Sequence, residues 1–238
     1  MRSPVAASAL ATFGIFCLLI GGSGGNATVA HAEMPFFDFN GFSYLNGSPA
    51  QVGTVVTVAA KFNEIQPNPI WPLDLVGNEY TVLVEDLTIT SVESYGSFLQ
   101  ITYGGGTIAV YRDPLRNGTW APNPPNSQVP SSFADGVPEL VGHFTEMALF
   151  FDDASGTGTV SGLVDWTSGD HFAQLADPAG WTFFGGVSNH AGLGIPEGYD
   201  LAWDPQLYGP QIPVPVEIGT WGALKARYNH ESRKIRQP

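Results

Sequence analysis

Apolar and polar positions alternate with a period of two along much of this chain of 238 residues. Every second side chain is apolar between residues 55 and 62, between 79 and 85, and between 98 and 103. Successive side chains of a β-strand point to opposite faces, so this period is typical of strands that bury one face. Four shorter segments also have strand-like composition: Phe36–Leu45, Leu87–Val92, Trp181–Phe184 and Tyr199–Trp203.

Two β-hairpins are predicted from turn residues that separate alternating segments. Gly104-Gly105-Gly106 lies between Phe98–Tyr103 and Thr107–Tyr111, and glycine adopts positive φ at no steric cost. Asp152–Gly156 separates Leu140–Phe151 from Thr157–Trp166. The first strand of this second hairpin is expected to place Val141, His143, Thr145, Met147, Leu149 and Phe151 on one face, and the second Val160, Gly162, Val164 and Trp166.

About ten short strands with frequent turn signals predict an all-β fold. The 29 glycines and 19 prolines disfavour a mostly helical chain. We therefore expect one antiparallel β-sandwich or barrel-like domain, with a short C-terminal helix. Inside this domain only His171–Ala176 has a helical pattern, with Asp170 as its cap.

The two ends of the chain differ from its middle. Arg2, an apolar run over 5–20 and Ala30-His31-Ala32 are typical of a cleaved secretory signal. We predict a signal peptide over 1–32, an all-β domain over 33–209, a proline-rich linker over 210–219 and a basic, helical tail over 220–238. The protein is then secreted or on the cell surface, with no transmembrane segment after cleavage.

Charge separates the domain from the tail. The chain has 22 acidic and 9 basic residues, for a net charge of −13. Residues 33–217 hold 21 acids and 3 bases, or −18, whereas residues 218–238 hold 5 bases and 1 acid, or +4. Nucleic-acid binding needs a basic patch, which the domain lacks, so nucleic acid is not an expected partner.

Five tryptophans are the candidate ligand-binding residues. Trp71 and Trp120 lie in proline-rich loops, and exposed loop aromatics on a rigid β scaffold can stack on sugar faces. The alternative is that these rings fill the ends of the β domain. The full candidate set is Trp71, Trp120, Trp166, Trp181 and Trp203.

Carboxylates offer weaker candidates for chemistry. Glycoside cleavage needs two carboxyls across a cleft, and Asp165, Asp200 and Asp204 lie near tryptophans, but nothing selects one pair. Asp152 and Asp153 in the hairpin turn offer oxygen ligands for calcium, with an ordinary Asx turn as the alternative. No other cofactor is expected. His171 and His190 flank the Trp181 segment and are either a second site or solvated loop residues.

Three segments carry a resemblance to other proteins. Asp113–Asn126, with Arg-Asp-Pro and Asn-Pro-Pro-Asn, and Gly198–Asp204 resemble exported, β-rich bacterial proteins of unknown function. Thr220-Trp221-Gly222-Ala223-Leu224-Lys225 resembles a short C-terminal tail found on varied exported bacterial proteins. The resemblance implies a shared processing or surface-attachment role for the tail, and it implies no activity.

The favoured hypothesis is an exported, non-enzymatic surface or extracellular matrix protein that binds carbohydrate or another envelope component through loop aromatics. One alternative is a secreted carbohydrate-active enzyme that uses a carboxylate pair. A second is a lipocalin-like carrier of a small molecule, which requires an apolar cavity inside a barrel. Whether the protein is an enzyme is left open by the sequence.

Overall fold

The computed structural model describes residues 35–47, 50–64, 71–120, 131–190 and 192–210. The described part is all-β, as predicted, with nine strands and two single-turn 3₁₀ helices, η2 and η3. The elements are β1 (Pro35–Asn46), β2 (Val55–Glu64), β3 (Glu79–Tyr95), β4 (Phe98–Gly104), β5 (Thr107–Asp113), η2 (Ser131–Phe133), β6 (Val137–Asp152), β7 (Thr157–Ser168), η3 (Phe172–Gln174), β8 (Trp181–Ser188) and β9 (Leu201–Tyr208).

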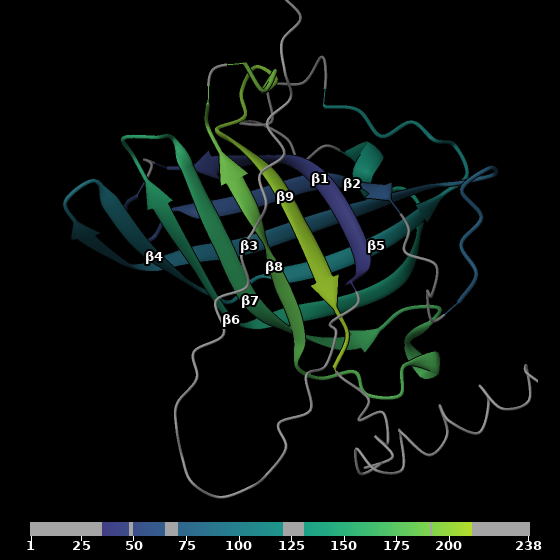
Figure 1. Ribbon diagram of the computed structural model, residues 1–238. Coiled ribbons are helices and arrows are strands. Elements are labelled where there is room, and N and C mark those ends of the chain that lie inside the picture. Colours follow the sequence, from purple (N-terminus) through teal and green to yellow (C-terminus); the bar gives the residue numbers. More distant parts are fainter. Residues whose placement is uncertain (1–34, 48–49, 65–70, 121–130, 191, 211–238) are drawn as a thin grey trace, which may run out of the picture. The chain divides into compact units, whose positions relative to one another are not determined.

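The strands form one closed antiparallel barrel rather than a sandwich (Figure 1). Each strand pairs with the next one along the chain, except that β4 pairs with β3 and β6 and not with β5, and β9 pairs with β1 to close the ring. Because β4 and β5 together fill the single position between β3 and β6, the nine strands make a barrel of eight. The barrel-like form of the fold prediction is therefore confirmed.

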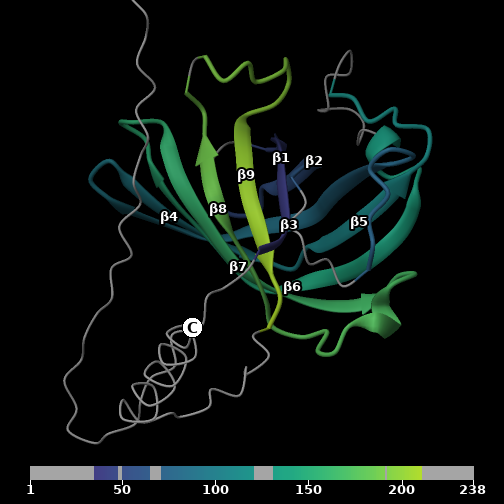
Figure 2. The same ribbon diagram turned by 45° about the vertical axis from the view of Figure 1, so that its right-hand side comes forward.

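The hairpin predicted at Gly104-Gly105-Gly106 is wrong. β4 and β5 do not pair with each other; they follow one another along the barrel wall and run in the same direction, each antiparallel to β3 (Figures 1 and 2). Gly105 and Gly106 have φ of +68° and +93°, which kinks one long strand instead of reversing it. The neighbouring β3 kinks at Asp86, with φ +59°, so adjacent strands bend together.

The face prediction for β6 is correct only after residue 146. A bulge between Phe144 and Glu146 shifts the register, so the buried residues are Leu140, Gly142 and Phe144 before it, and Met147, Leu149 and Phe151 after it. His143 and Thr145 are exposed. In β7 the predicted set of Val160, Gly162, Val164 and Trp166 is buried, and the predicted β6–β7 hairpin is present.

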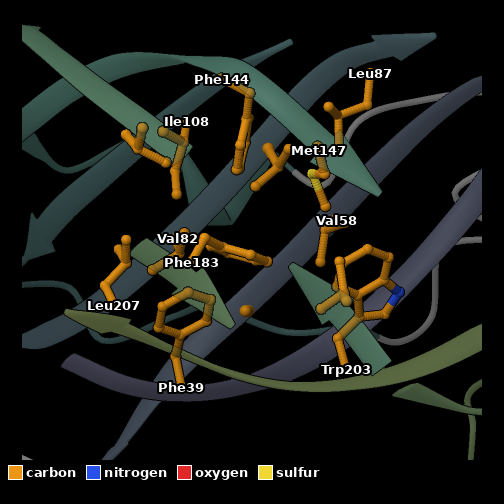
Figure 3. Close-up of a cluster of buried hydrophobic side chains, with 14 of the residues drawn as sticks. Phe39, Val58, Val82, Leu87, Ile108, Phe144, Met147, Phe183, Trp203 and Leu207 are labelled. Atoms are coloured by element: carbon orange, nitrogen blue, oxygen red, sulfur yellow. The ribbon is translucent and has the colours of Figure 1, made fainter. Parts of the chain in front are cut away.

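Aromatic rings fill the middle of the barrel. Figure 3 shows Phe39, Phe144, Phe183 and Trp203 converging from four strands. The rings of Phe144 and Phe183 meet edge to face with centroids 5.3 Å apart, and Phe39 lies 5.8 Å from Phe183. Edge-to-face packing of this kind stabilises a core beyond the area it buries.

The outer face of β2 and β3 is covered as well. Phe133 of η2 packs on Ala59 and Leu83. The Thr81 hydroxyl donates to the Phe133 carbonyl at 2.9 Å, and Trp120 Nε1 donates to the Ala59 carbonyl at 2.9 Å. These two strands are thus buried on both faces over part of their length.

The remaining predictions concern helices and chain ends. The helix predicted over His171–Ala176 is reduced to η3, and the Asp170 cap is absent because His171 precedes η3 without a side-chain cap. The signal peptide, the linker from residue 211 onward and the tail helix lie outside the described residues. Within the described ranges, no helix has the length and apolar character to cross a membrane.

Candidate functional site

One end of the barrel contains an apolar cavity, here called the cup, of about 300 Å³. The connections β1–β2, β3–β4, β6–β7 and β8–β9 surround this open end. Most of the lining consists of apolar side chains that face the barrel interior. The lining residues are Leu45, Ala50, Ile89, Leu99, Ile101, Tyr103, Leu149, Phe151, Asp153, Asn189, Asp200 and Leu201.

Strand register gives the depth of the cup. Leu99 pairs with Phe151 near the hairpin tips, and Tyr103 pairs with Met147 four residues further in. Four residues of a strand span about 13 Å, so Tyr103 lies at the inner end of the cup. Its side chain is 6% exposed, and its hydroxyl has no hydrogen bond to any other described residue. Burial raises the pKa of the Tyr103 hydroxyl, which keeps it a neutral donor.

The rim of the cup is acidic. One oxygen of the Asp200 carboxylate accepts the Leu45 N–H at 2.9 Å, which joins the start of β9 to β1. Partial burial raises the pKa of Asp200, and the Leu45 hydrogen bond opposes this shift. Asp153 and Asn189 complete the polar rim, and Asn189 N–H donates to the Gly156 carbonyl at 2.9 Å.

The other end of the barrel is filled by side chains. Trp71, from the β2–β3 connection, stacks on His171 with centroids 4.3 Å apart and contacts Phe37 at 5.8 Å. The carboxylate of Glu139, which is fully buried, pairs with both Arg112 and His171. His190 lies beyond the far end of β8, so His171 and His190 do not form a shared site.

Four of the five candidate tryptophans belong to the core. Trp71, Trp166, Trp181 and Trp203 are between 1% and 3% exposed. Stacking on a sugar needs an exposed ring face, which these four lack; instead they pack within the barrel and across its closed end. Only Trp120 remains partly exposed.

Trp120 borders a second, larger hollow, here called the outer groove, of about 610 Å³. The groove runs over β1, β9 and β8 on the outside of the barrel. Phe42 meets Trp120 edge to face at 5.1 Å, and Asn40, Ser188 and Asp204 supply polar groups. Burial raises the pKa of Asp204, and the nearby Asp38 raises it further.

The candidate catalytic carboxylates are not brought together. Asp200, just before β9, lines the cup, and Asp204 within β9 lines the outer groove. Four residues of extended chain separate them, which corresponds to about 13 Å. Asp165 lines neither cavity and accepts the Gly180 N–H at 2.7 Å. Since glycoside cleavage needs two carboxyls facing one cleft, the geometry offers no pair among these three residues.

The candidate calcium turn is held by its own hydrogen bonds. Asp152 accepts the Ala154 N–H at 3.2 Å, and bonds from Ser97 and Ser155 help to lower its pKa. The described part of the chain has no group of three or more His, Cys, Asp or Glu side chains placed to hold a metal ion. Calcium at Asp152 and Asp153 stays a sequence prediction.

Sequence reasoning missed most of the cup. The sequence pattern did not predict that Tyr103 and Asp200 line the same cavity. Their proximity depends on the pairing of β9 with β1, which the alternation of apolar and polar residues does not reveal. It also missed three exposed aromatic residues near the open end, on strands rather than loops. These are Tyr95, Phe98 and Phe150.

No protein-family model, curated protein or solved structure matches this chain. Function is therefore argued from the geometry of the cup and the outer groove.

Proposed function

We propose that the protein binds a small, largely apolar molecule in the cup. The observation that carries the proposal is an apolar cavity of about 300 Å³ inside one end of a closed barrel. Barrels of eight strands are wide enough to hold one small ligand. An apolar lining with a few polar groups is the common composition of small-molecule sites.

The proposal is tested by calorimetric titration of the full-length chain with 4-ethylphenol, a neutral probe. We expect saturable binding that Leu99→Trp abolishes, because the larger side chain fills the cup. Leu163→Trp is the matched control, since Leu163 lies on β7 outside the cup. Absence of binding by the unmodified chain, or equal binding by both variants, contradicts the proposal.

A second candidate function is carbohydrate binding in the outer groove. It rests on Trp120, whose ring is fixed by the Ala59 hydrogen bond and by Phe42, beside Asn40 and Asp204. An aromatic face next to hydrogen-bonding side chains matches the two surfaces of a sugar ring. This keeps the sequence hypothesis of a sugar-binding aromatic but confines it to one tryptophan.

Retention on immobilised polysaccharides tests this second function. Trp120→Ala is expected to remove retention, while Phe150→Ala, an exposed aromatic outside the groove, leaves it unchanged. Loss of retention only with Phe150→Ala places the interaction at the exposed aromatic residues near the open end, Tyr95, Phe98 and Phe150, and rejects the groove. Circular dichroism of each variant checks that the barrel is intact.

The proposal includes export to the cell surface or exterior, on the basis of the N-terminal sequence pattern. Fractionation of cells that express the full-length chain tests it. We expect a shortened product outside the cytoplasm that begins after Ala32, as read by N-terminal sequencing. An uncleaved product in the cytoplasm rejects this part.

A further inference from the structure

We infer that the ligand of the cup is a small organic amine, with its ammonium group at the rim and a polar group at its inner end. This inference rests on the proposed function and specifies the chemistry of the molecule bound. It follows from three features of the cup: its acidic rim, its apolar walls and the hydroxyl of Tyr103, which has no partner among the described residues.

The rim favours a cation. Asp153 and Asp200 both line the cup, and no lysine or arginine lines it. The three bases of the described residues lie elsewhere: Lys61 pairs with Glu79, Arg112 with Glu139, and Arg116 donates to the Val76 carbonyl. A cation entering the open end therefore meets two carboxylates without a competing base from the described part of the chain.

The walls favour an apolar body of limited size. Leu99, Ile101, Leu149 and Phe151 form facing pairs across β4 and β6. A cavity of about 300 Å³ is at the lower end of the range for small-molecule sites. A single aromatic ring with a two-carbon arm is of suitable size, whereas a long acyl chain is too large.

Tyr103 favours a polar group at the inner end. The side chain of Tyr103 is only 6% exposed, and its hydroxyl has no hydrogen-bond partner among the described residues. The hydroxyl oxygen is not one of the fully enclosed atoms that lack a partner, and Tyr103 lines the cup, so a ligand atom in the cup can reach it. Its raised pKa keeps the proton available for donation. A ligand oxygen at the inner end of the cup would accept this hydrogen bond.

Four matched probes separate these contributions in calorimetric titrations of the full-length chain at pH 8. Tyramine carries both the ammonium and the hydroxyl, phenethylamine only the ammonium, 4-ethylphenol only the hydroxyl, and 4-hydroxyphenylacetate a carboxylate in place of the ammonium. We expect tyramine to bind most tightly and 4-hydroxyphenylacetate most weakly.

Two substitutions assign the contacts. Asp200→Asn should weaken tyramine binding on the order of fivefold and leave 4-ethylphenol unchanged, because an amide still accepts the Leu45 N–H but carries no charge. Tyr103→Phe should reduce the affinity for tyramine to the affinity that the unmodified chain has for phenethylamine. Asp177→Asn is the control, since Asp177 also accepts a backbone N–H, from Ala179, and lies outside the cup.

The outcomes distinguish this inference from the proposed function. If 4-ethylphenol binds and Leu99→Trp blocks it, but tyramine binds no more tightly, the amine inference is wrong and the apolar site stands. Tighter binding of 4-hydroxyphenylacetate than of tyramine also overturns the inference. If none of the four probes binds, both the inference and the proposed function fail.

Discussion

The two ends of the barrel differ in how their interior is filled. At the closed end, Trp71 stacks on His171, and the buried Glu139 carboxylate pairs with both Arg112 and His171. At the open end, Leu99 and Phe151 face a cavity, and the polar groups stand at the rim. Packed side chains fill the interior at the closed end, whereas the interior at the open end contains a cavity. This difference is the basis of our proposal that the closed end stabilises the fold and the open end binds a ligand.

The largest expected effect concerns packing at the two ends. Trp181→Ala should destabilise the protein by about 4 kcal/mol, because it removes a fully buried ring that packs on Trp166 and Phe36. Leu99→Ala should cost about 1 kcal/mol, because Leu99 is partly exposed and already borders a cavity. Urea unfolding followed by circular dichroism measures both. Equal losses of stability in the two variants would contradict the difference in packing between the two ends.

The buried ion pair gives the next effect. Arg112→Met should cost about 3 kcal/mol, since it leaves the Glu139 carboxylate buried without its arginine. Adding Glu139→Gln should recover part of that loss, because the charge is then removed as well. The same unfolding measurement on both single variants and the double variant gives the coupling. Additive losses would show that the two side chains do not act as a pair.

The smallest effect is a pH dependence at the open end. Burial raises the pKa of Asp200 in the folded state, so the folded protein keeps this proton to a higher pH than the unfolded chain. Its contribution therefore makes stability fall as pH rises from about 4 through the raised pKa. Glu85 and Asp204 also have raised pKa values, so they too make stability fall as pH rises. Their contribution is the same in the unmodified chain and in a variant changed only at Asp200, so it cancels when the two are compared.

Comparing unfolding midpoints of the unmodified chain and Asp200→Asn between pH 3.5 and 6 isolates the Asp200 contribution. The advantage of the unmodified chain over the variant should shrink across this range. A difference that is constant with pH would show that the carboxylate at the rim titrates as it does in water.

Alternation along the chain was sufficient to predict strands and buried faces where the register is regular. β7 is such a case, and its Val160, Gly162, Val164 and Trp166 are buried as expected. It failed at irregularities, because a bulge changes the face without changing the composition. Phe144 and Glu146 in β6 and the glycines between β4 and β5 are the two examples. A glycine with positive φ can produce a kink in a continuing strand as well as a chain-reversing turn, and the sequence does not distinguish the two.

The cup could not be predicted in the same way. Asp200 and Leu45 are 155 residues apart in sequence, and their contact depends on the pairing of β9 with β1. The sequence identified the tryptophans as candidate ligand-binding residues, but their positions in loops and the composition around them do not reveal whether a ring is exposed. Trp71 lies in a proline-rich loop and is nevertheless buried against Phe37.

The most direct test of the difference between the two ends is methyl NMR of the full-length chain during titration with 4-ethylphenol. The methyl groups of Leu99, Ile101 and Leu149 line the cup, whereas those of Leu140 and Leu207 are buried outside it. We predict saturable shifts of the first group and none of the second. Shifts of Leu140 and Leu207 without shifts of the cup residues, or no shifts at all, would contradict a ligand site at the open end.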